Sequence, residues 1–137
     1  MNENELSRII VDSAFKIHTT LGPGLLESVY EAVLAHELEK RGLNVIRQRA
    51  IPVVYDTVKL DLGFRADIIV NGKVIVEVKS VDALAPVHAK QVRTYLRLTD
   101  LRLGLLINFN VDLIKDGIRR VVNDLQLPTV GEATSFS

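Results

Sequence analysis

The sequence predicts an α/β domain built from two helices, a group of three strands, a third helix and a further strand. Helices are indicated before residue 42, where apolar side chains recur every three or four positions. After Gly42 the chain changes to runs rich in β-branched residues, which favour strands. The run at 101–108 is continuously apolar, as expected of a strand in a sheet covered on both faces. We therefore expect a central β-sheet flanked by helices.

The N-terminal part contains two expected helices, separated by the helix-breaking segment 21–24. The first is expected over residues 3–18, with one buried stripe formed by Leu6, Ile9, Ile10, Ala14 and Ile17. The second is expected over residues 25–41, because Gly42 then occupies the position of a left-handed C-terminal cap. Four of its apolar residues are expected to face inward: Leu26, Val29, Val33 and Leu38.

The remaining elements follow from β-branched runs and turn residues. Strands are expected at 45–55, 58–70, 73–78, 101–108 and 118–122. A third helix is expected over 86–98, because Pro86 suits the first turn of a helix. We assign residues 1–127 to a single domain and expect residues 128–137, which have no periodic pattern, to form a flexible tail.

Length and composition restrict the class of protein. A chain of 137 residues with 47% hydrophobic and 25% charged residues is typical of one globular domain. The 17 basic and 17 acidic residues cancel, so any site for a polyanion must be local. The sequence has no cysteine, which leaves oxygen or imidazole groups as metal ligands. Because no apolar run is long enough for a membrane span and the N-terminus lacks a signal-peptide pattern, we expect a cytoplasmic protein without a membrane partner.

Three charged residues on neighbouring strands form the main candidate site. Alternation along the third strand places Glu77 and Lys79 on the same face as Ile75. Asp67 lies among the apolar residues of the preceding strand, and a buried carboxylate needs a partner. Glu77 and Lys79 alone are more typical of an exposed strand face that carries an ion pair, so the interpretation depends on their neighbours, of which Asp67 is the first.

The turn at Asn71-Gly72 leaves two registers open. A two-residue type I′ turn would pair Asp67 with Val76 and separate the two acids. A three-residue turn over 70–72 would pair Asp67 with Ile75 and place Asp67 on the face of Glu77 and Lys79. In that arrangement the carboxylates repel unless a cation such as Mg²⁺ or Mn²⁺ lies between them.

Polar residues on two helices extend the candidate set. Glu27 lies in the first turn of the second helix, where stabilisation of the helix N-terminus is an alternative explanation. The third helix carries His88, Gln91 and Tyr95 on one sector. A separate stripe consists of Lys90, Arg93 and Arg97, which would suit either a solvated face or a phosphodiester substrate. His18 and His36 have no second imidazole at metal-ligand spacing, and His88 is expected to make a polar contact between loop and helix.

These residues resemble a known set of motifs. Asp67, then Glu77-Val78-Lys79, then Gln91 and Tyr95 is similar to the Asp, Glu-x-Lys and Gln-x-x-x-Tyr series of the PD-(D/E)XK nuclease superfamily, in the order of its RecB-like branch. The segment 24–30, GLLESVY, resembles the signature of the GxxExxY proteins, a bacterial and archaeal family placed in that superfamily. The resemblance covers about residues 9–123 and implies a restriction-endonuclease-like fold, a mixed central sheet flanked by helices.

The resemblance also implies a mechanism. Asp67 and Glu77 would hold a Mg²⁺ that polarises the scissile phosphate and lowers the pKa of a bound water. Lys79 would position or activate that water, Glu27 would be a further metal ligand, directly or through water, and Gln91 and Tyr95 would orient the lysine or the phosphate. The expected function is a Mg²⁺-dependent nuclease acting on DNA, with Mn²⁺ as a substitute. The alternative is a catalytically silent binding or assembly module with the same fold, and the oligomeric state stays open between monomer and homodimer.

Overall fold

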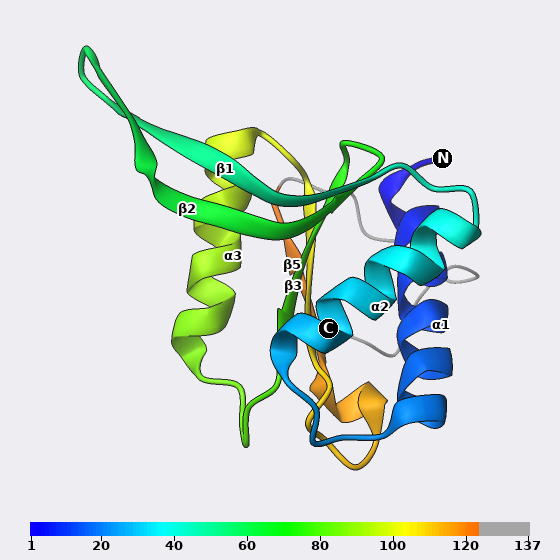
Figure 1. Cartoon of the computed structure of the whole chain (residues 1–137). Helices are drawn as coiled ribbons and strands as arrows, with labels where there is room; N and C mark the ends of the chain where they lie inside the picture. Colours follow the sequence, from blue (N-terminus) through cyan, green and yellow to red (C-terminus); the bar gives the residue numbers. More distant parts are fainter. Residues whose placement is uncertain (124–137) are drawn as a thin grey trace.

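The computed structural model describes residues 1–123, apart from the side chain of Leu62 (Figure 1). The elements are α1 (Glu3–Leu21), α2 (Glu27–Lys40), β1 (Val45–Tyr55), β2 (Val58–Val70), β3 (Val74–Lys79), α3 (Pro86–Thr99), β4 (Leu103–Asn108), the short 3₁₀ helix η1 (Ile114–Gly117) and β5 (Ile118–Val122). Every expected helix and strand is present, with ends that differ by at most three residues. The expected tail at 128–137 lies outside the described residues.

The strands form one mixed sheet in the order β1-β2-β3-β4-β5. Among the strands of residues 1–123, only β3 and β4 pair in parallel, and α3 connects them as a crossover. Helices α1 and α2 cover one face of the sheet and α3 covers the other (Figure 1). The structure therefore confirms the predicted α/β class with a mixed sheet flanked by helices.

Each face of the sheet has its own hydrophobic core. Val74, Val76 and Val78 of β3 pack with α1 and α2, whereas Ile75 packs with α3. Gly104 allows α3 to lie close against β4, because a Cβ atom there would be 2.4 Å from the Val92 side chain. The alternation along β3 thus directs Glu77, on the face of Ile75, toward the layer between sheet and α3.

The inward face of α2 differs from the prediction. Leu26 is 74% exposed and Val29 is also exposed, while Tyr30, Leu34, Ala35 and Leu38 form the buried side. Two acids are buried on the same helix, and bases from distant segments pair with them. Lys16 Nζ lies 2.6 Å from Glu37 Oε1, and Arg47 Nη2 lies 2.9 Å from Glu31 Oε2. Because their charges are paired, these two acids can lie on the buried side of α2. The spacing of apolar residues does not reveal such pairs, and it therefore predicted the wrong orientation for Leu26 and Val29.

The β2–β3 turn has a third register that differs from both alternatives. Asn71 and Gly72 have positive φ angles of 52° and 63°, and the Lys73 amide donates to the Val70 carbonyl at 3.0 Å. The strands nevertheless pair Val70 with Val74, so Lys73 is an additional residue of the loop. Both proposed registers are therefore wrong, although Asp67 does lie on the face of Glu77, as the second one required.

The β1–β2 hairpin extends beyond the helices as a projecting arm (Figure 1). Its register shifts between Ile51 and Val53, and its turn contains Asp56 with a φ angle of 57°. The apolar residues near its end are exposed, most of all Tyr55 at 78%. Among the described residues, no helix combines the length and apolar character that a membrane span requires.

Candidate active site

The candidate site lies where β2 and β3 separate. Their ladder ends at the pair Ile68 and Val76, whereas β3 remains paired with β4 as far as Lys79. One residue beyond the last pair, the side chains of Asp67 and Glu77 link the two strands. The Asp67 amide donates to Glu77 Oε1 at 3.2 Å, and the Val78 amide donates to Asp67 Oδ2 at 2.8 Å. Both carboxyl groups are therefore fixed by backbone groups at the point of separation.

Glu77 is almost completely buried, with 3% of its surface exposed. Its pKa is raised to about 9, first by burial and then by the negative charge of Asp67 and a hydrogen bond with that carboxyl group, while the Asp67 amide and Lys79 act in the lowering direction. Without a cation, Glu77 therefore keeps its proton at neutral pH. A strongly perturbed carboxyl group beside a second acid is the electrostatic pattern of many functional sites.

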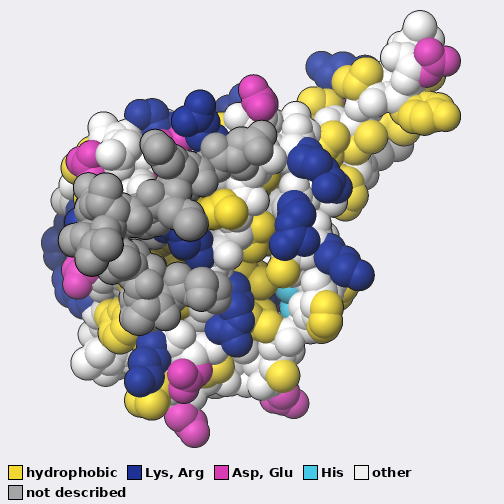
Figure 2. All heavy atoms as spheres, turned by 180° about the vertical axis from the view of Figure 1, so that it is seen from behind, with side chains coloured by type: hydrophobic (Ala, Val, Ile, Leu, Met, Phe, Trp, Pro, Cys, Tyr) yellow, Lys and Arg dark blue, Asp and Glu magenta, His cyan; other side chains and the backbone are white. Residues whose placement is uncertain are grey.

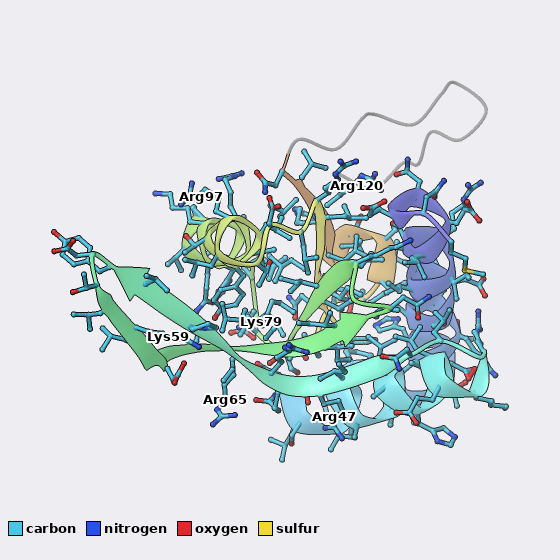
Figure 3. All side chains as sticks on the ribbon, turned by 90° about the horizontal axis from the view of Figure 1, so that it is seen from above. Arg47, Lys59, Arg65, Lys79, Arg97 and Arg120 are labelled. Carbon is cyan, nitrogen blue, oxygen red and sulfur yellow. The ribbon has the colours of Figure 1, made fainter. Side chains whose placement is uncertain are left out.

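Lys79 lies at the end of β3 and lines an open cleft of about 550 Å³. The cleft extends between β2 and α3, and its lining includes Phe64 from β2 and Lys90 and Gln91 from α3. In Figure 3, Lys79 lies between the hairpin and α3. Lys79 and Gln91 are thus brought together in one cleft, on the face of the sheet that carries Glu77.

Tyr95 is buried in the layer between α3 and the sheet, with 3% of its surface exposed. Burial raises its pKa to about 12, and the charges of Glu77 and Asp67 contribute in the same direction. Its ring lies 5.1 Å from that of Phe64, at a 59° angle. Tyr95 therefore lies near enough to both acids to feel their charge, contacts Phe64 in the wall of the cleft, and keeps its hydroxyl proton at neutral pH.

Gln48 of β1 connects Asp67 with a buried acid of α2. Glu31 accepts hydrogen bonds from Arg47 Nε at 3.0 Å and from Gln48 Nε2 at 2.7 Å, and Gln48 Nε2 lies 3.4 Å from Asp67 Oδ1. Burial raises the pKa of Glu31, and the charge of Asp67 adds to this against the lowering effect of Arg47 and Gln48. Gln48 adopts a φ angle of 53°, a left-handed conformation that is uncommon for a non-glycine residue.

Glu31 and Gln48 are not among the residues predicted from the sequence. Glu31 could have been found, because it lies one helical turn after Glu27 and shares a face with it. Gln48 gave no signal, because a polar residue in an amphipathic strand is ordinary. Its contact depends on the local backbone conformation of β1, which the sequence does not reveal.

Glu27 lies at the start of α2, beside the end of β3. The Ser80 hydroxyl donates to the Leu25 carbonyl at 2.7 Å, which joins the loop before α2 to the residue after Lys79. Tyr30 stabilises this loop, since its hydroxyl donates to the Gly22 carbonyl at 2.6 Å and accepts from the Leu25 amide at 3.1 Å. Within residues 1–123, no hydrogen bond or ion pair links Glu27 to either acid of the site, so its role as a ligand remains a prediction.

The chain is similar to a known protein superfamily over most of its length. A model of the PD-(D/E)XK nuclease superfamily matches residues 4–121, which include every element of the site. The chain belongs to the PD-(D/E)XK nuclease superfamily. No curated protein and no solved structure matches it significantly. Its mixed sheet with helices on both faces is consistent with the restriction-endonuclease-like fold of the superfamily.

Nucleases of this superfamily typically use divalent metal ions, and the residues present fit that requirement. Asp67 and Glu77 offer carboxylate oxygens, and Mg²⁺ is usually bound through one or two carboxylates and several waters. Across the described part of the chain, no three acidic or imidazole side chains converge on one position. Protein ligation would therefore come first from Asp67 and Glu77, with waters completing the coordination.

The basic stripe on α3 is exposed, as expected, but its members occupy different places. Lys90 lines the cleft, whereas Figure 3 shows Arg97 on the side of α3 away from the hairpin. Figure 2 shows Lys and Arg side chains along the side of the molecule that carries α3, below the projecting hairpin. A polyanion would thus meet positive charge on the α3 side of the PD-(D/E)XK domain.

Two of the three histidines make hydrogen bonds with the backbone. His88 Nδ1 accepts a hydrogen bond from the Ala85 amide at 3.0 Å, which confirms the expected contact between loop and helix. The buried His18 lies 2.8 Å from the Val111 carbonyl through Nε2, and His36 is exposed. These positions agree with the assignment of His18 and His36 to the surface or core edge.

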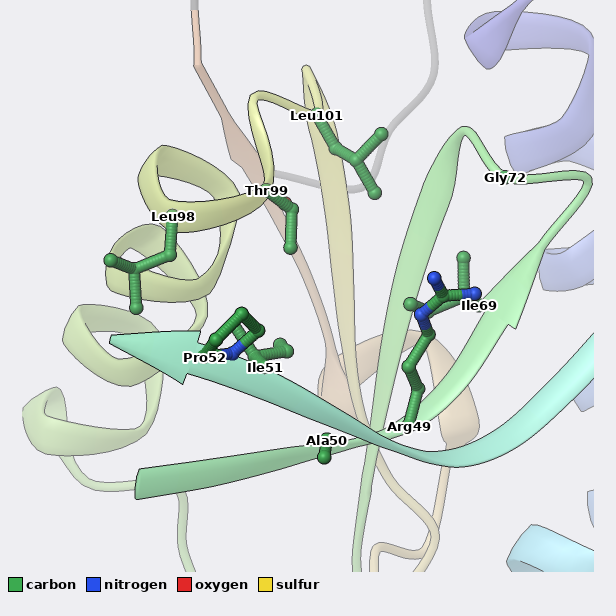
Figure 4. Close-up of a pocket in the computed structure, with 9 residues that line it drawn as sticks. All are labelled: Arg49, Ala50, Ile51, Pro52, Ile69, Gly72, Leu98, Thr99 and Leu101. Carbon is green, nitrogen blue, oxygen red and sulfur yellow. The ribbon is translucent and has the colours of Figure 1, made fainter. Parts of the chain in front are cut away.

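A second cavity of about 350 Å³ lies between β1 and the end of α3 (Figure 4). Arg49, Ile51 and Pro52 line it on one side, and Leu98 and Thr99 on the other. None of the proposed catalytic residues lines this cavity. Lys79 and Gln91, by contrast, line the cleft between β2 and α3.

Proposed function

We propose that this protein is a Mg²⁺-dependent nuclease that hydrolyses DNA phosphodiester bonds, with Mn²⁺ able to replace Mg²⁺. The observation that carries the proposal is the convergence of Asp67 and Glu77 at the separation of β2 and β3, with Lys79 on the same face. Two acids held together at an electrostatic cost are expected where a cation is to bind. The membership of the superfamily supports the same reaction class.

In this proposal the residues of the chain have separate roles. Asp67 and Glu77 hold the metal, which supplies a Lewis acid for the phosphate and lowers the pKa of a bound water when present. Lys79 orients the attacking water and neutralises charge that develops on the phosphate. Gln91 and Tyr95 position the lysine or the phosphate. Gln91 lines the cleft, and Tyr95 contacts the ring of Phe64, which also lines it.

The finer assignments extend this proposal. The segment 24–30 supports an assignment to the GxxExxY proteins, and within it Tyr30 stabilises the loop that precedes Glu27. Glu27 supplies a further metal ligand, directly or through water. Lys90, Arg93 and Arg97 bind substrate phosphates, since all three are exposed on α3.

A cleavage assay tests the proposal. Supercoiled plasmid and single-stranded DNA are incubated with wild-type protein in Mg²⁺, in Mn²⁺ or in EDTA, beside Asp67→Asn and Glu77→Gln in matched preparations. We expect cleavage by the wild type with either metal, none in EDTA and a loss of at least about 100-fold in each variant. Asp61→Asn is the matched control, because Asp61 is an exposed acid of the same strand.

Two outcomes would contradict the nuclease. Wild-type protein that binds metal and DNA but cuts neither substrate would favour the silent module. Cleavage at the full rate in Asp67→Asn would indicate a contaminating enzyme or a different active site.

A further inference from the structure

The cleft at Lys79 combines apolar and cationic groups. Phe64 of β2 and Val87 of α3 are its apolar members, and Val87 is 62% exposed. Lys79 and Lys90 supply positive charge, and among the described residues that line the cleft none is acidic. Such a surface suits a ligand that carries a flat apolar group and a negative charge on one unit, as a nucleotide does.

Phe64 is held in place from two directions. Its backbone pairs with Ile51 in the β1–β2 ladder, and its ring contacts that of Tyr95 at a centroid distance of 5.1 Å. The side chain is nevertheless only half-buried, and it contributes to the lining of the cleft. A rigid ring with free surface can stack on a ligand at low cost in conformational entropy.

The strands place this ring close to the acids. Phe64 precedes Asp67 by three residues on β2, and Lys79 follows Glu77 by two residues on the same face of β3. Phe64 and Lys79 both line the cleft, so it begins next to the separation of the two strands. A nucleotide in the cleft would thus lie adjacent to a phosphate positioned at Asp67 and Glu77.

Only an unpaired base can use such a ring. In the interior of a duplex both faces of each base are covered by its neighbours, so stacking on a protein ring there requires a splayed, frayed or single-stranded base. The volume of about 550 Å³ lies within the range of roughly 300–1,000 Å³ that is usual for small-molecule sites. The cleft is therefore large enough for a nucleotide.

We propose that this cleft is a nucleotide subsite in which Phe64 stacks on an unpaired base beside the scissile phosphate, so that the preferred substrate is a single-stranded or frayed nucleic acid. Lys79 and Lys90 bind the phosphates that flank this base, and the Gln91 amide hydrogen-bonds to its edge. This proposal rests on the proposed nuclease function for its biological role, but the subsite is a binding property that does not require metal.

Binding measured in EDTA tests the subsite without cleavage. A short labelled oligonucleotide of mixed sequence, as DNA and as RNA, is titrated by fluorescence anisotropy, beside a blunt duplex of the same length. We expect tighter binding of the single strands and a loss of about 5- to 150-fold in Phe64→Ala and Phe64→Leu, with duplex affinity nearly unchanged. The matched control is Tyr55→Ala, which removes the exposed aromatic ring at the end of the same hairpin.

Phe64→Trp provides a direct readout that a structural effect would not give. The chain has no tryptophan, so this variant introduces a single indole at the proposed stacking position. We expect single strands to bind it as tightly as the wild type and to quench its fluorescence, and the duplex to quench it much less. Thermal melting of each variant shows that it is folded, and the Leu and Trp variants decide the question if Phe64→Ala fails to fold.

The outcomes separate the subsite from the nuclease. Equal affinity for single strands and duplex, with no effect of Phe64→Leu and no quenching in Phe64→Trp, would overturn the subsite even if the protein cleaves DNA. Quenching together with the loss in Phe64→Leu would support the subsite even if no metal produces cleavage. A comparable loss in Tyr55→Ala would overturn it too, because binding would then depend on the hairpin as a whole.

Discussion

The side chains of Asp67 and Glu77 continue the pairing of β2 and β3 beyond its last backbone pair. Each carboxyl group accepts a hydrogen bond from the backbone of the opposite strand, at 2.8 Å for Asp67 and 3.2 Å for Glu77. The backbone pairing of these strands stops at Ile68 and Val76, while β3 continues along β4 to Lys79. The two acids thus hold together strands that would otherwise be unpaired at this point. The sheet fixes the distance between the two carboxyl groups, so a ligand that binds both of them finds them already positioned.

Divalent metal should stabilise the wild type but not Asp67→Asn. The asparagine oxygen can still accept the Val78 amide, so this substitution keeps the local structure while removing a charged ligand. At a metal concentration of about 100 times Kd, we expect a stabilisation of about 2.7 kcal/mol in the wild type and almost none in the variant. Thermal melting with and without Mg²⁺ or Mn²⁺ measures this. Equal stabilisation of wild type, Asp67→Asn and the Asp61→Asn control would reject the site.

The metal-free protein should lose stability as the pH rises from about 5 to about 9. Glu77 keeps its proton in the folded state up to a pKa of about 9, whereas in the unfolded chain it loses it near the ordinary value of 4.5. The folded state therefore binds more protons over this range, and the free energy of unfolding falls with pH. Each pKa unit corresponds to about 1.4 kcal/mol, so a decrease of a few kcal/mol is expected. Urea denaturation in EDTA measures it, and Glu77→Gln should remove most of the slope. A slope in Glu77→Gln parallel to that of the wild type would contradict this assignment.

Much of the site was predictable because it follows from strand alternation. The period of two places Glu77 and Lys79 on one face of β3 regardless of the turn, and the apolar surroundings of Asp67 mark it as unusual. The fold class was predictable for a similar reason, since helical and strand periods change clearly at Gly42. Gly42 itself has the positive φ angle, 87°, that its position as a helix terminator predicts.

The rest of the site depends on contacts between distant segments. Asn71 and Gly72 have the positive φ angles expected of a two-residue turn. Lys73 nevertheless belongs to the loop, so that Val70 pairs with Val74, and this sets the register of β2 and β3. Glu31 is buried because Arg47, sixteen positions away, pairs with it. Neither pairing leaves a periodic trace in the sequence, so neither the register nor the burial of Glu31 could be derived from it.

Neutralising Lys90 should weaken DNA binding mainly through phosphate contacts. We expect Lys90→Gln to lower the slope of log K against log salt by about 0.7 to 0.9 in magnitude, and Lys90→Gln combined with Arg93→Gln and Arg97→Gln to lower it further. Affinity is measured in EDTA over a range of salt concentrations. Lys115→Gln is the control, because Lys115 is an exposed lysine on η1, which packs with α1 on the other face of the sheet. An unchanged slope in the triple variant would place the substrate elsewhere.

Removal of the Tyr30 hydroxyl should loosen the loop before α2. Tyr30→Phe keeps the ring that stacks on Phe109 at 4.6 Å but loses the bonds to Gly22 and Leu25. Because two backbone groups lose their partner, we expect a loss of about 1 to 3 kcal/mol in the free energy of unfolding. If Glu27 contributes to metal binding, the metal affinity should also fall. Denaturation and metal titration measure the two effects, and a variant as stable as wild type would show that the loop does not depend on Tyr30.

Lys79→Ala should abolish strand cleavage while leaving the fold and metal binding almost intact. The lysine acts on water and phosphate in the proposed reaction and is not a metal ligand, so its loss should reduce the rate by about 10² to 10⁴. Its side chain lines the open cleft and is only half-buried, so its removal leaves no buried group without a partner. The assay compares plasmid and single-stranded cleavage by wild type, Lys79→Ala and Lys73→Ala, the last being an exposed lysine in the loop before the same strand. Thermal melting with metal separates chemistry from stability, since a rate loss of this size at an unchanged melting temperature cannot arise from partial unfolding. Cleavage at the wild-type rate in Lys79→Ala would remove the lysine from the mechanism, and an equal loss in Lys73→Ala would show that the effect is one of charge alone.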